Sequence, residues 1–178
     1  MYYRTSYDSP TGAITLACAD GRLAGLWFNG QKYYGDSVPE PMIPNDDLPV
    51  FHMAKNWLDR YFSGQRPDVD ELPLAPIGGA FRQMVWRILR EIPYGEVTAY
   101  GEIAKRVAAK TGRPMSGQAV GGAVGHNPIS IIIPCHRVVG ANGSLTGYNG
   151  GIAVKRKLLE LEGVDTDRFR IPRTGTAL

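Results

Sequence analysis

The sequence predicts a mixed α/β (α+β) protein with a small sheet-and-helix domain at residues 1–75, a helical domain at residues 76–165 and a tail at residues 166–178. Three observations carry this prediction. Short apolar runs are divided by turn residues near the N-terminus, residues 66–80 are rich in Pro and Gly, and apolar residues recur at helical spacing beyond them. With 178 residues, 43% of them hydrophobic, the chain is long enough to bury a core.

The first 30 residues are predicted to form β-structure. The apolar runs AITLACAD and RLAGLWFNG meet at Asp20-Gly21, which is a strong hairpin signal. Residues 35–50 contain four prolines and four acidic residues and are predicted to be loop. An amphipathic helix follows and ends at Ser63-Gly64, with one apolar stripe made of Phe51, Ala54, Leu58 and Phe62.

The second half is predicted to be helical. In the first helix, AFRQMVWRILREI, one face carries Phe81, Val85, Leu89 and Ile92, and Pro93-Tyr94-Gly95 ends it. The next helix is expected to begin with Thr98 as its N-cap and to end at Gly112, and its apolar positions are Tyr100, Ile103, Ala104 and Val107. Ser116 can cap a third helix, GQAVGGAVG. Helix, short turn and helix give the outline of a helix-turn-helix, which any helical hairpin shares.

The third helix of this half is unusually rich in glycine. Gly117, Gly121 and Gly122 should each cost about 1 kcal/mol relative to alanine. Tight packing against another helix would explain them. The alternative is a face without side chains that a bulky partner, such as a nucleic-acid backbone, can approach.

Charge is distributed unevenly along the chain. Residues 1–80 contain six Lys/Arg and ten Asp/Glu, whereas residues 81–178 contain fourteen and seven. The sign of the net charge changes near the Pro/Gly-rich stretch, which supports a domain boundary near residues 72–80. The basic half suggests a polyanion as partner, although a chance surface bias would give the same counts.

No membrane span or secretory signal is visible in the sequence. No apolar run approaches the roughly 20 residues of a spanning helix, and the N-terminus lacks a basic region followed by an apolar one. The two cysteines, Cys18 and Cys135, make no disulfide framework. We therefore expect a soluble, cytoplasmic protein that does not engage membranes.

Cys135 lies between a proline and a histidine in IIIPCHRVVG, residues 131–140. A thiol becomes nucleophilic as its thiolate, which needs a nearby base or positive charge, and His136 and Arg137 follow directly. Neighbouring side chains of an extended segment point to opposite faces, so a water molecule would have to link His136 to Cys135. The alternative is a buried, unreactive cysteine beside a hydrogen-bonded histidine. A metal site is disfavoured because adjacent Cys and His do not have chelating spacing.

The segment GGAVGHNPISIIIPCHRVVGANGSLTGYNGGIAVKRKLLELEG closely resembles the signature region of O6-alkylguanine-DNA alkyltransferases, also called methylated-DNA–protein-cysteine methyltransferases. The resemblance continues upstream through FRQMVWRILREIPYGEVTAYGEIA and covers residues 80–163. It implies a ribonuclease H-like N-terminal domain and a winged helix-turn-helix domain that binds DNA and carries the reaction. The first 75 residues match the family only in their general organisation, a sheet-and-helix domain that leads into a linker.

The resemblance also implies the reaction and its residues. The family transfers an alkyl group once, from O6 of a damaged guanine in double-stranded DNA to its own cysteine, as a monomer and without a cofactor. Cys135 matches the acceptor, His136 the water-linked base and Glu162 the carboxylate that orients the imidazole. Tyr100 matches the tyrosine whose hydroxyl assists the departing guanine. Whether O4-alkylthymine is also accepted does not follow from the sequence.

The Gly-rich helix of the family enters the minor groove while the target nucleotide is rotated into the pocket. Asn127 matches the asparagine that braces the turn between this helix and the active site, and Tyr148 matches a residue that lines the base pocket. The DNA- and base-binding residues implied in this way are Asn127, Gln118, Tyr148, Ser116, Ala119, Gly122 and Arg113.

Two features depart from the family pattern. Gln118 occupies the position commonly filled by the arginine that takes the place of the flipped base, so we expect DNA affinity to depend more on Lys105, Arg106, Lys110 and Arg113. Some relatives hold a structural zinc in the N-terminal domain, but that part of this chain offers only Cys18 and His52 as soft ligands. We expect no metal.

Three other functions compete with this reading. A non-catalytic protein that recognises alkyl lesions would lack the acceptor, whereas Cys135 is present. A Cys-His-Glu hydrolase or thioesterase would turn over repeatedly and would have no reason for a basic helix-turn-helix. A winged-helix transcription regulator would bind palindromic sites and would be indifferent to loss of Cys135.

Overall fold

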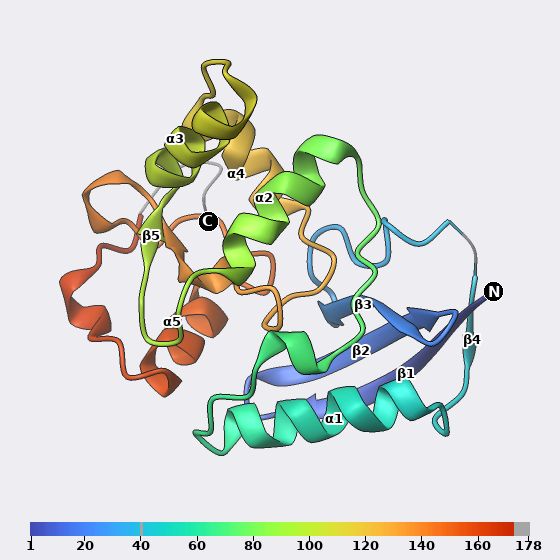
Figure 1. Ribbon diagram of the computed structural model, residues 1–178. Coiled ribbons are helices and arrows are strands. Elements are labelled where there is room, and N and C mark those ends of the chain that lie inside the picture. The colour runs from blue at the N-terminus through green and yellow to red at the C-terminus, as the bar shows by residue number, and fades with distance from the viewer. Residues whose placement is uncertain (40, 173–178) are drawn as a thin grey trace. The chain divides into compact units, whose positions relative to one another are not determined.

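The structure, a computed structural model, describes residues 1–39 and 41–172 and divides into two compact units. The first comprises Met1–Gly78 with Pro128–Ile132, and the second comprises Gly79–Asn127 with the chain from Ile133 onward (Figure 1). The sequence assigned residues 128–132 to the second domain. They belong to the first unit because they pair with one of its strands: Leu26 N–H donates to the Pro128 carbonyl (2.8 Å) and Ser130 N–H donates to the Leu26 carbonyl (3.1 Å).

The first unit is built on a four-stranded sheet in the order β3-β2-β1-β4, made of β1 (Tyr2–Ser9), β2 (Gly12–Ala19), β3 (Arg22–Phe28) and β4 (Met42–Pro44). The predicted hairpin at Asp20-Gly21 is confirmed, because Ala19 pairs with Arg22 and both turn residues have positive φ, as a two-residue hairpin loop requires. The prediction of loop alone at residues 35–50 is wrong at β4. That strand pairs in parallel with the start of β1, a distant partner that no local pattern indicates.

The helix α1 (Pro49–Phe62) lies along this sheet and covers one face of it (Figure 1). Phe51, Ala54 and Leu58 are buried as predicted, whereas Phe62 is only partly buried and Tyr61 takes the buried place. A three-residue 3-10 turn, Val69–Glu71, follows. Within the sheet, Gly25 is required by close approach, because a Cβ there would lie 2.0 Å from the Trp27 ring.

The second unit contains α2 (Ala80–Arg90), α3 (Tyr100–Thr111), α4 (Gly117–Gly125) and α5 (Ile152–Leu161). Two short parallel strands, β5 (Thr98–Ala99) and β6 (Val138–Val139), form its small sheet. Its described residues also form short 3-10 turns at Cys135–Arg137, Ala141–Gly143 and Thr166–Arg168. The prediction of Thr98 as an N-cap is wrong, because Thr98 pairs with Val138 in the sheet and the helix begins at Tyr100.

The helices α2, α3 and α4 pack against one another. Most of the apolar positions predicted for α2 and α3 are buried, whereas Phe81 and Tyr100 are only partly buried. Trp86 of α2 is 1% exposed and donates from its indole nitrogen to the Ala123 carbonyl of α4 (2.9 Å). Gly112 ends α3 in the left-handed conformation, and the Ser116 hydroxyl accepts from Ala119 N–H to cap α4 (3.1 Å). The helix-turn-helix outline is therefore present.

The predicted tail begins too early. Residues up to Arg170 belong to the fold, since Leu145 N–H donates to the Arg170 carbonyl (2.8 Å) and Phe169 packs on the apolar cluster of Val139, Leu145, Leu159 and Val164. The last part of that tail, residues 173–178, lies outside the described residues. Within residues 1–39 and 41–172, no helix is long and apolar enough to cross a membrane.

Candidate active site around Cys135

Pro134 fixes the approach of the chain to Cys135. Its φ of −81° and ψ of 64°, with a 2.8 Å hydrogen bond from Cys135 N–H to the Ile133 carbonyl, describe an inverse γ-turn. Proline suits the centre of this turn because its ring restricts φ to nearly this value. The Asn127 side chain, 2% exposed, donates to the same Ile133 carbonyl from Nδ2 (2.8 Å). Proline and asparagine thus hold the peptide from which the cysteine projects.

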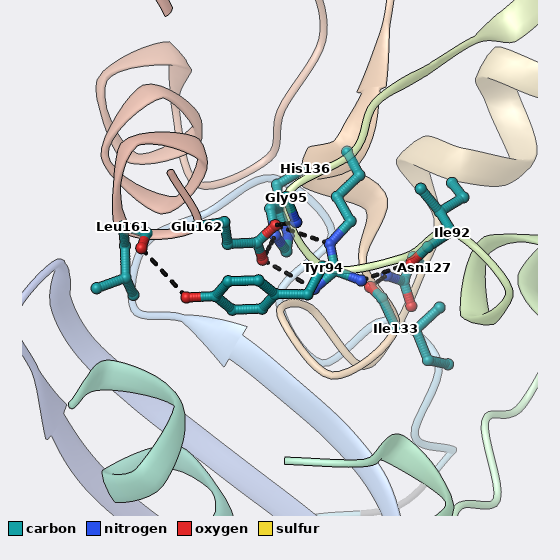
Figure 2. Close-up of polar contacts among 9 residues, drawn as sticks. Ile92, Tyr94, Gly95, Asn127, Ile133, His136, Leu161 and Glu162 are labelled. Carbon is teal, nitrogen blue, oxygen red and sulfur yellow. Dashed lines mark hydrogen bonds and ion pairs between the residues drawn. The ribbon is translucent and has the colours of Figure 1, made fainter. Parts of the chain in front are cut away.

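Cys135 is 7% exposed, and the His136 side chain beside it is fully buried. His136 Nε2 lies 2.7 Å from Glu162 Oε1, and Glu162 sits at the C-terminal end of α5 (Figure 2). The carboxylate therefore fixes the imidazole tautomer with the proton on Nε2, so that Nδ1 is the ring nitrogen able to accept a proton. This arrangement of base and orienting carboxylate is the one that activates nucleophiles in hydrolases and transferases.

Glu162 receives further donors besides His136. Arg137 binds both carboxylate oxygens, from Nε (2.9 Å) and from Nη2 (2.9 Å). The backbone N–H of Gly95 donates to Oε2 (3.3 Å), and Figure 2 shows Gly95 and Tyr94 beside this carboxylate. From the sequence, Arg137 was only a candidate positive charge near Cys135, and Gly95 was only part of a helix end; their contacts with Glu162 were not predicted.

Burial and these partners set the protonation states of the pair. Burial lowers the pKa of His136, and the nearby Arg137 and Lys155 charges lower it further, against an opposing contribution from Glu162. Burial would raise the pKa of Glu162, but the hydrogen bonds and charges of His136 and Arg137 outweigh it and hold that pKa well below its usual range. Before the reaction, therefore, the imidazole of His136 is neutral and the carboxylate of Glu162 is ionised.

Tyr100, the first residue of α3, donates from its hydroxyl to the Thr146 carbonyl (3.3 Å). Burial and the Cys135 charge raise the pKa of Tyr100 to about 12, so its hydroxyl stays protonated near neutral pH. This phenol can therefore donate its one proton to a group that enters beside Cys135, in exchange for the Thr146 carbonyl.

Lys155 is a functional candidate that was not predicted from the sequence. It lies on α5, is 0% exposed, and donates from Nζ to the Val138 and Thr146 carbonyls, the latter at 2.8 Å. Burial lowers its pKa to about 8, whereas the Cys135 charge acts in the opposite direction. A lysine that occurs at helical spacing from Leu158 and Leu159 shares their buried face, which is the sequence signal that could have found it.

The loop before α5 encloses the same region. Tyr148 is 8% exposed, and its ring meets the His136 ring edge-on at a centroid distance of 6.5 Å. The side chain of Asn149 donates to the Gly125 carbonyl at the end of α4. Cys135, His136, Glu162, Tyr100, Asn127 and Tyr148 are thus gathered in one unit, and Lys155 and Arg137 join them.

The remaining predicted residues lie on α4 and the turn before it. Arg113, Ser116, Gln118, Ala119 and Gly122 are exposed. A Cβ at Gly122 would meet nothing within 4 Å, and one at Gly121 would make ordinary contact with the Tyr100 ring at 4.0 Å. Packing in this structure therefore does not require glycine at either position.

The basic residues of α3 differ in their surroundings. Lys105 pairs with Glu102 at 2.8 Å, and Arg106 pairs with Glu91. Lys110 and Arg113 are exposed beyond them. Exposed pairs contribute little to stability, so Lys105 and Arg106 can exchange their partners for phosphate at small cost.

Both parts of the chain match known families. Residues 1–76 match the 6-O-methylguanine DNA methyltransferase, ribonuclease-like domain, and residues 80–164 match the 6-O-methylguanine DNA methyltransferase, DNA binding domain. Methylated-DNA–protein-cysteine methyltransferases from Haemophilus influenzae and Mycobacterium tuberculosis are 43% and 47% identical to this chain. The alignments cover 92% of this chain and 87% of the first relative, and 91% of this chain and 92% of the second.

Solved structures give the same result. Mycobacterium tuberculosis O6-methylguanine methyltransferase is 42% identical, with a TM-score of 0.77 over 98% of this chain and 97% of that one. A structure described as Mycobacterium tuberculosis OGT in complex with DNA is 43% identical, with a TM-score of 0.77 over 94% of each chain. These similarities extend over both units, and this chain therefore belongs to the 6-O-methylguanine DNA methyltransferase family.

Proposed function

We propose that this protein repairs DNA by direct reversal: it transfers the alkyl group from O6 of an alkylated guanine to Cys135, once per molecule. The observation that carries the proposal is the buried His136–Glu162 pair next to Cys135, within the unit that matches the DNA binding domain of the family. The DNA complex of a 43% identical relative supports DNA as the partner.

The transfer is a displacement at a saturated carbon. Cys135 loses its proton through a water molecule to His136 Nδ1, and Glu162 stabilises the imidazolium that forms. The thiolate sulfur then bonds to the alkyl carbon as the bond from that carbon to O6 breaks, and the electron pair of the broken bond stays with guanine. The proton that left the thiol balances the charge on guanine, so the products are S-alkylcysteine and restored guanine.

Tyr100 assists the leaving group. Its hydroxyl is protonated, because its pKa lies at about 12, and it can donate a hydrogen bond to the departing base. The thioether product holds no bond that water can readily cleave, so Cys135 is not regenerated. This single use separates the proposal from a Cys-His-Glu hydrolase, which would form product repeatedly.

The exposed face of α4 supports minor-groove binding. Gly121 and Gly122 each cost about 1 kcal/mol of helix stability relative to alanine, yet no neighbour in the structure demands glycine there. The cost is explained if the bare face lies against DNA while the target nucleotide rotates into the pocket beside Cys135. Gln118 projects from the same exposed face and would fill the gap left in the base stack.

The proposal includes action as a monomer in the cytoplasm. Neither Cys18 nor Cys135 forms a disulfide in the structure, which suits a reducing compartment.

The test uses a DNA duplex that contains a single O6-methylguanine, mixed with the protein under reducing conditions. Intact-protein mass spectrometry should show a gain of one methyl group and no more, and peptide mapping should locate it on Cys135. Product should stop forming at one equivalent per protein. Product in excess of protein would favour a hydrolytic or catalytic activity, and no gain in mass would refute the repair function.

Replacement of Gln118 by arginine should tighten DNA binding and leave methyl transfer intact. The added cation releases about one more counterion, so the slope of log affinity against log salt should steepen by about one. Fluorescence anisotropy at several salt concentrations measures this slope, with Gln118→Lys as the matched charge control. Loss of transfer in Gln118→Arg would mean that α4 does not lie where the proposal requires.

Replacement of Gly122 by leucine should weaken DNA binding without unfolding the protein. The position is exposed and its surroundings are open, and leucine favours a helix over glycine, so the melting temperature should hold or rise. A side chain between helix and groove should reduce affinity by about tenfold or more, equivalent to about 1.4 kcal/mol. Gly122→Ala is the control and should lose less. Equal affinity of both variants and wild type would place the DNA elsewhere.

A further inference from the structure

Arg137, which follows His136, has no part in the steps described above, yet it is tied to the centre of the site. Its guanidinium binds both oxygens of Glu162 (2.9 Å each) and also donates from Nη1 to the Ile92 carbonyl (2.7 Å). The Arg137 side chain is 11% exposed and that of Glu162 is 0% exposed. A two-point contact of this kind is among the most specific that a carboxylate can make.

The turn between α2 and β5 holds this contact in place. Gly95 N–H donates to Glu162 Oε2 (3.3 Å), and the Tyr94 hydroxyl donates to the Leu161 carbonyl (3.1 Å), both visible in Figure 2. The Arg137 guanidinium also lies over the Tyr94 ring, 5.7 Å from its centroid. Gly95 has a φ of 81°, and a Cβ there would lie 3.1 Å from the Glu162 carbonyl oxygen. The turn therefore accommodates only glycine well at this position.

Burial is the largest cause that lowers the pKa of His136, and the charge of Arg137 adds to it. Glu162, Arg137 and Lys155 act on the imidazole electrostatically, and Cys135 and the Tyr148 ring adjoin it. An ionised carboxylate at 2.7 Å favours the imidazolium. An imidazolium at rest could not take a proton from the thiol. Arg137 opposes that outcome because its charge offsets the charge of Glu162.

We propose that Arg137 is a positioning residue for the transfer reaction: it orients and neutralises Glu162, so that His136 rests as the neutral imidazole that can accept the proton of Cys135. The inference rests on the proposed function, because it concerns the same proton transfer. Arg137 itself does not touch the reacting atoms. It acts through the carboxylate, and the turn at Tyr94–Gly95 supplies the second anchor.

The experiment compares Arg137→Gln and Arg137→Met, which remove the charge with two different shapes, with Arg137→Lys, which retains it. Without the cation, the His136–Glu162 pair loses its proton only at a higher pH. The pH midpoint below which the single-turnover rate of methyl transfer falls should therefore rise by about one unit in both neutral variants. Arg137→Lys should keep the wild-type midpoint and lose only rate, because the two-point contact is gone. If only one of the two neutral variants folds, as verified by circular dichroism, that variant is sufficient to test the role of Arg137.

A second measurement needs no DNA. The ¹⁵N resonances of the His136 ring in the wild-type protein should show a neutral imidazole protonated at Nε2 at pH 7, and their titration midpoint should rise in the neutral variants. A protonated His136 at pH 7, or equal midpoints in all proteins with a uniform loss of rate, would overturn the inference. Absence of methyl transfer in the wild type would refute the proposed function instead, and the resonances would still decide the role of Arg137.

Discussion

The Cys135→Ala protein is expected to bind a duplex containing O6-methylguanine and to gain no methyl group at any time of incubation. Alanine removes the only atom that bonds to the transferred carbon, so transfer should be lost altogether. Binding should persist, because the exposed face of α4 is unchanged. Intact-protein mass spectrometry and anisotropy measure the two quantities separately.

Cys18→Ala is the matched control, since it removes the other cysteine of the chain. Cys18 is 1% exposed in the first unit, and burial raises the pKa of its thiol, which therefore stays protonated and unreactive. This variant should accept one methyl group, as the wild type does. Methylation that survives in Cys135→Ala and disappears in Cys18→Ala would reverse the assignment of the acceptor.

The second large effect is expected from Lys155→Met. Methionine fills the buried volume of the lysine stem, but it removes the cation that interacts with the Cys135 charge. At pH 7 the lysine is charged, because its pKa of about 8 lies above that pH. The thiolate of Cys135 should become less populated, and a loss of about 1.4 kcal/mol would slow transfer about tenfold. Single-turnover rates with the methylated duplex measure the loss.

Lys157→Met applies the same chemical change two positions further along α5, where the side chain is exposed. Its transfer rate should equal that of the wild type. The melting temperature of Lys155→Met serves as a second control, because both the Val138 and Thr146 carbonyls lose a donor. A normal transfer rate in a folded Lys155→Met protein would show that this lysine only supports the loop.

Local chemistry made much of the fold predictable from the sequence. Asp20-Gly21 specifies its hairpin because both residues tolerate positive φ. Ser116 and Gly112 mark helix ends through contacts within a few residues. The pair of His136 and Glu162 was expected from the family resemblance, and the structure brings the two side chains to 2.7 Å.

The features that the sequence did not reveal depend on distant partners. Thr98 carries the pattern of an N-cap, but Val138 pairs with it as a strand. Lys155 lies in a charged segment, and its buried ammonium group bonds to two carbonyls, Val138 on β6 and Thr146 in the loop before α5, which only the folded chain brings together. The link from Arg137 to Ile92 joins segments far apart in the sequence, so no local pattern encodes it.

The route of the chain limits how this protein can be divided. Asn127 and Ile133 belong to the second unit, whereas the five residues between them belong to the first, where Pro128 and Ser130 bond to Leu26 of β3. A gene fragment that begins at residue 79 would encode Pro128–Ile132 without the strand to which they bond. The two regions match separate family descriptions, but they cannot be exchanged independently. Recombination or truncation near residue 79 would separate the segment just before Pro134 from strand β3, to which it bonds.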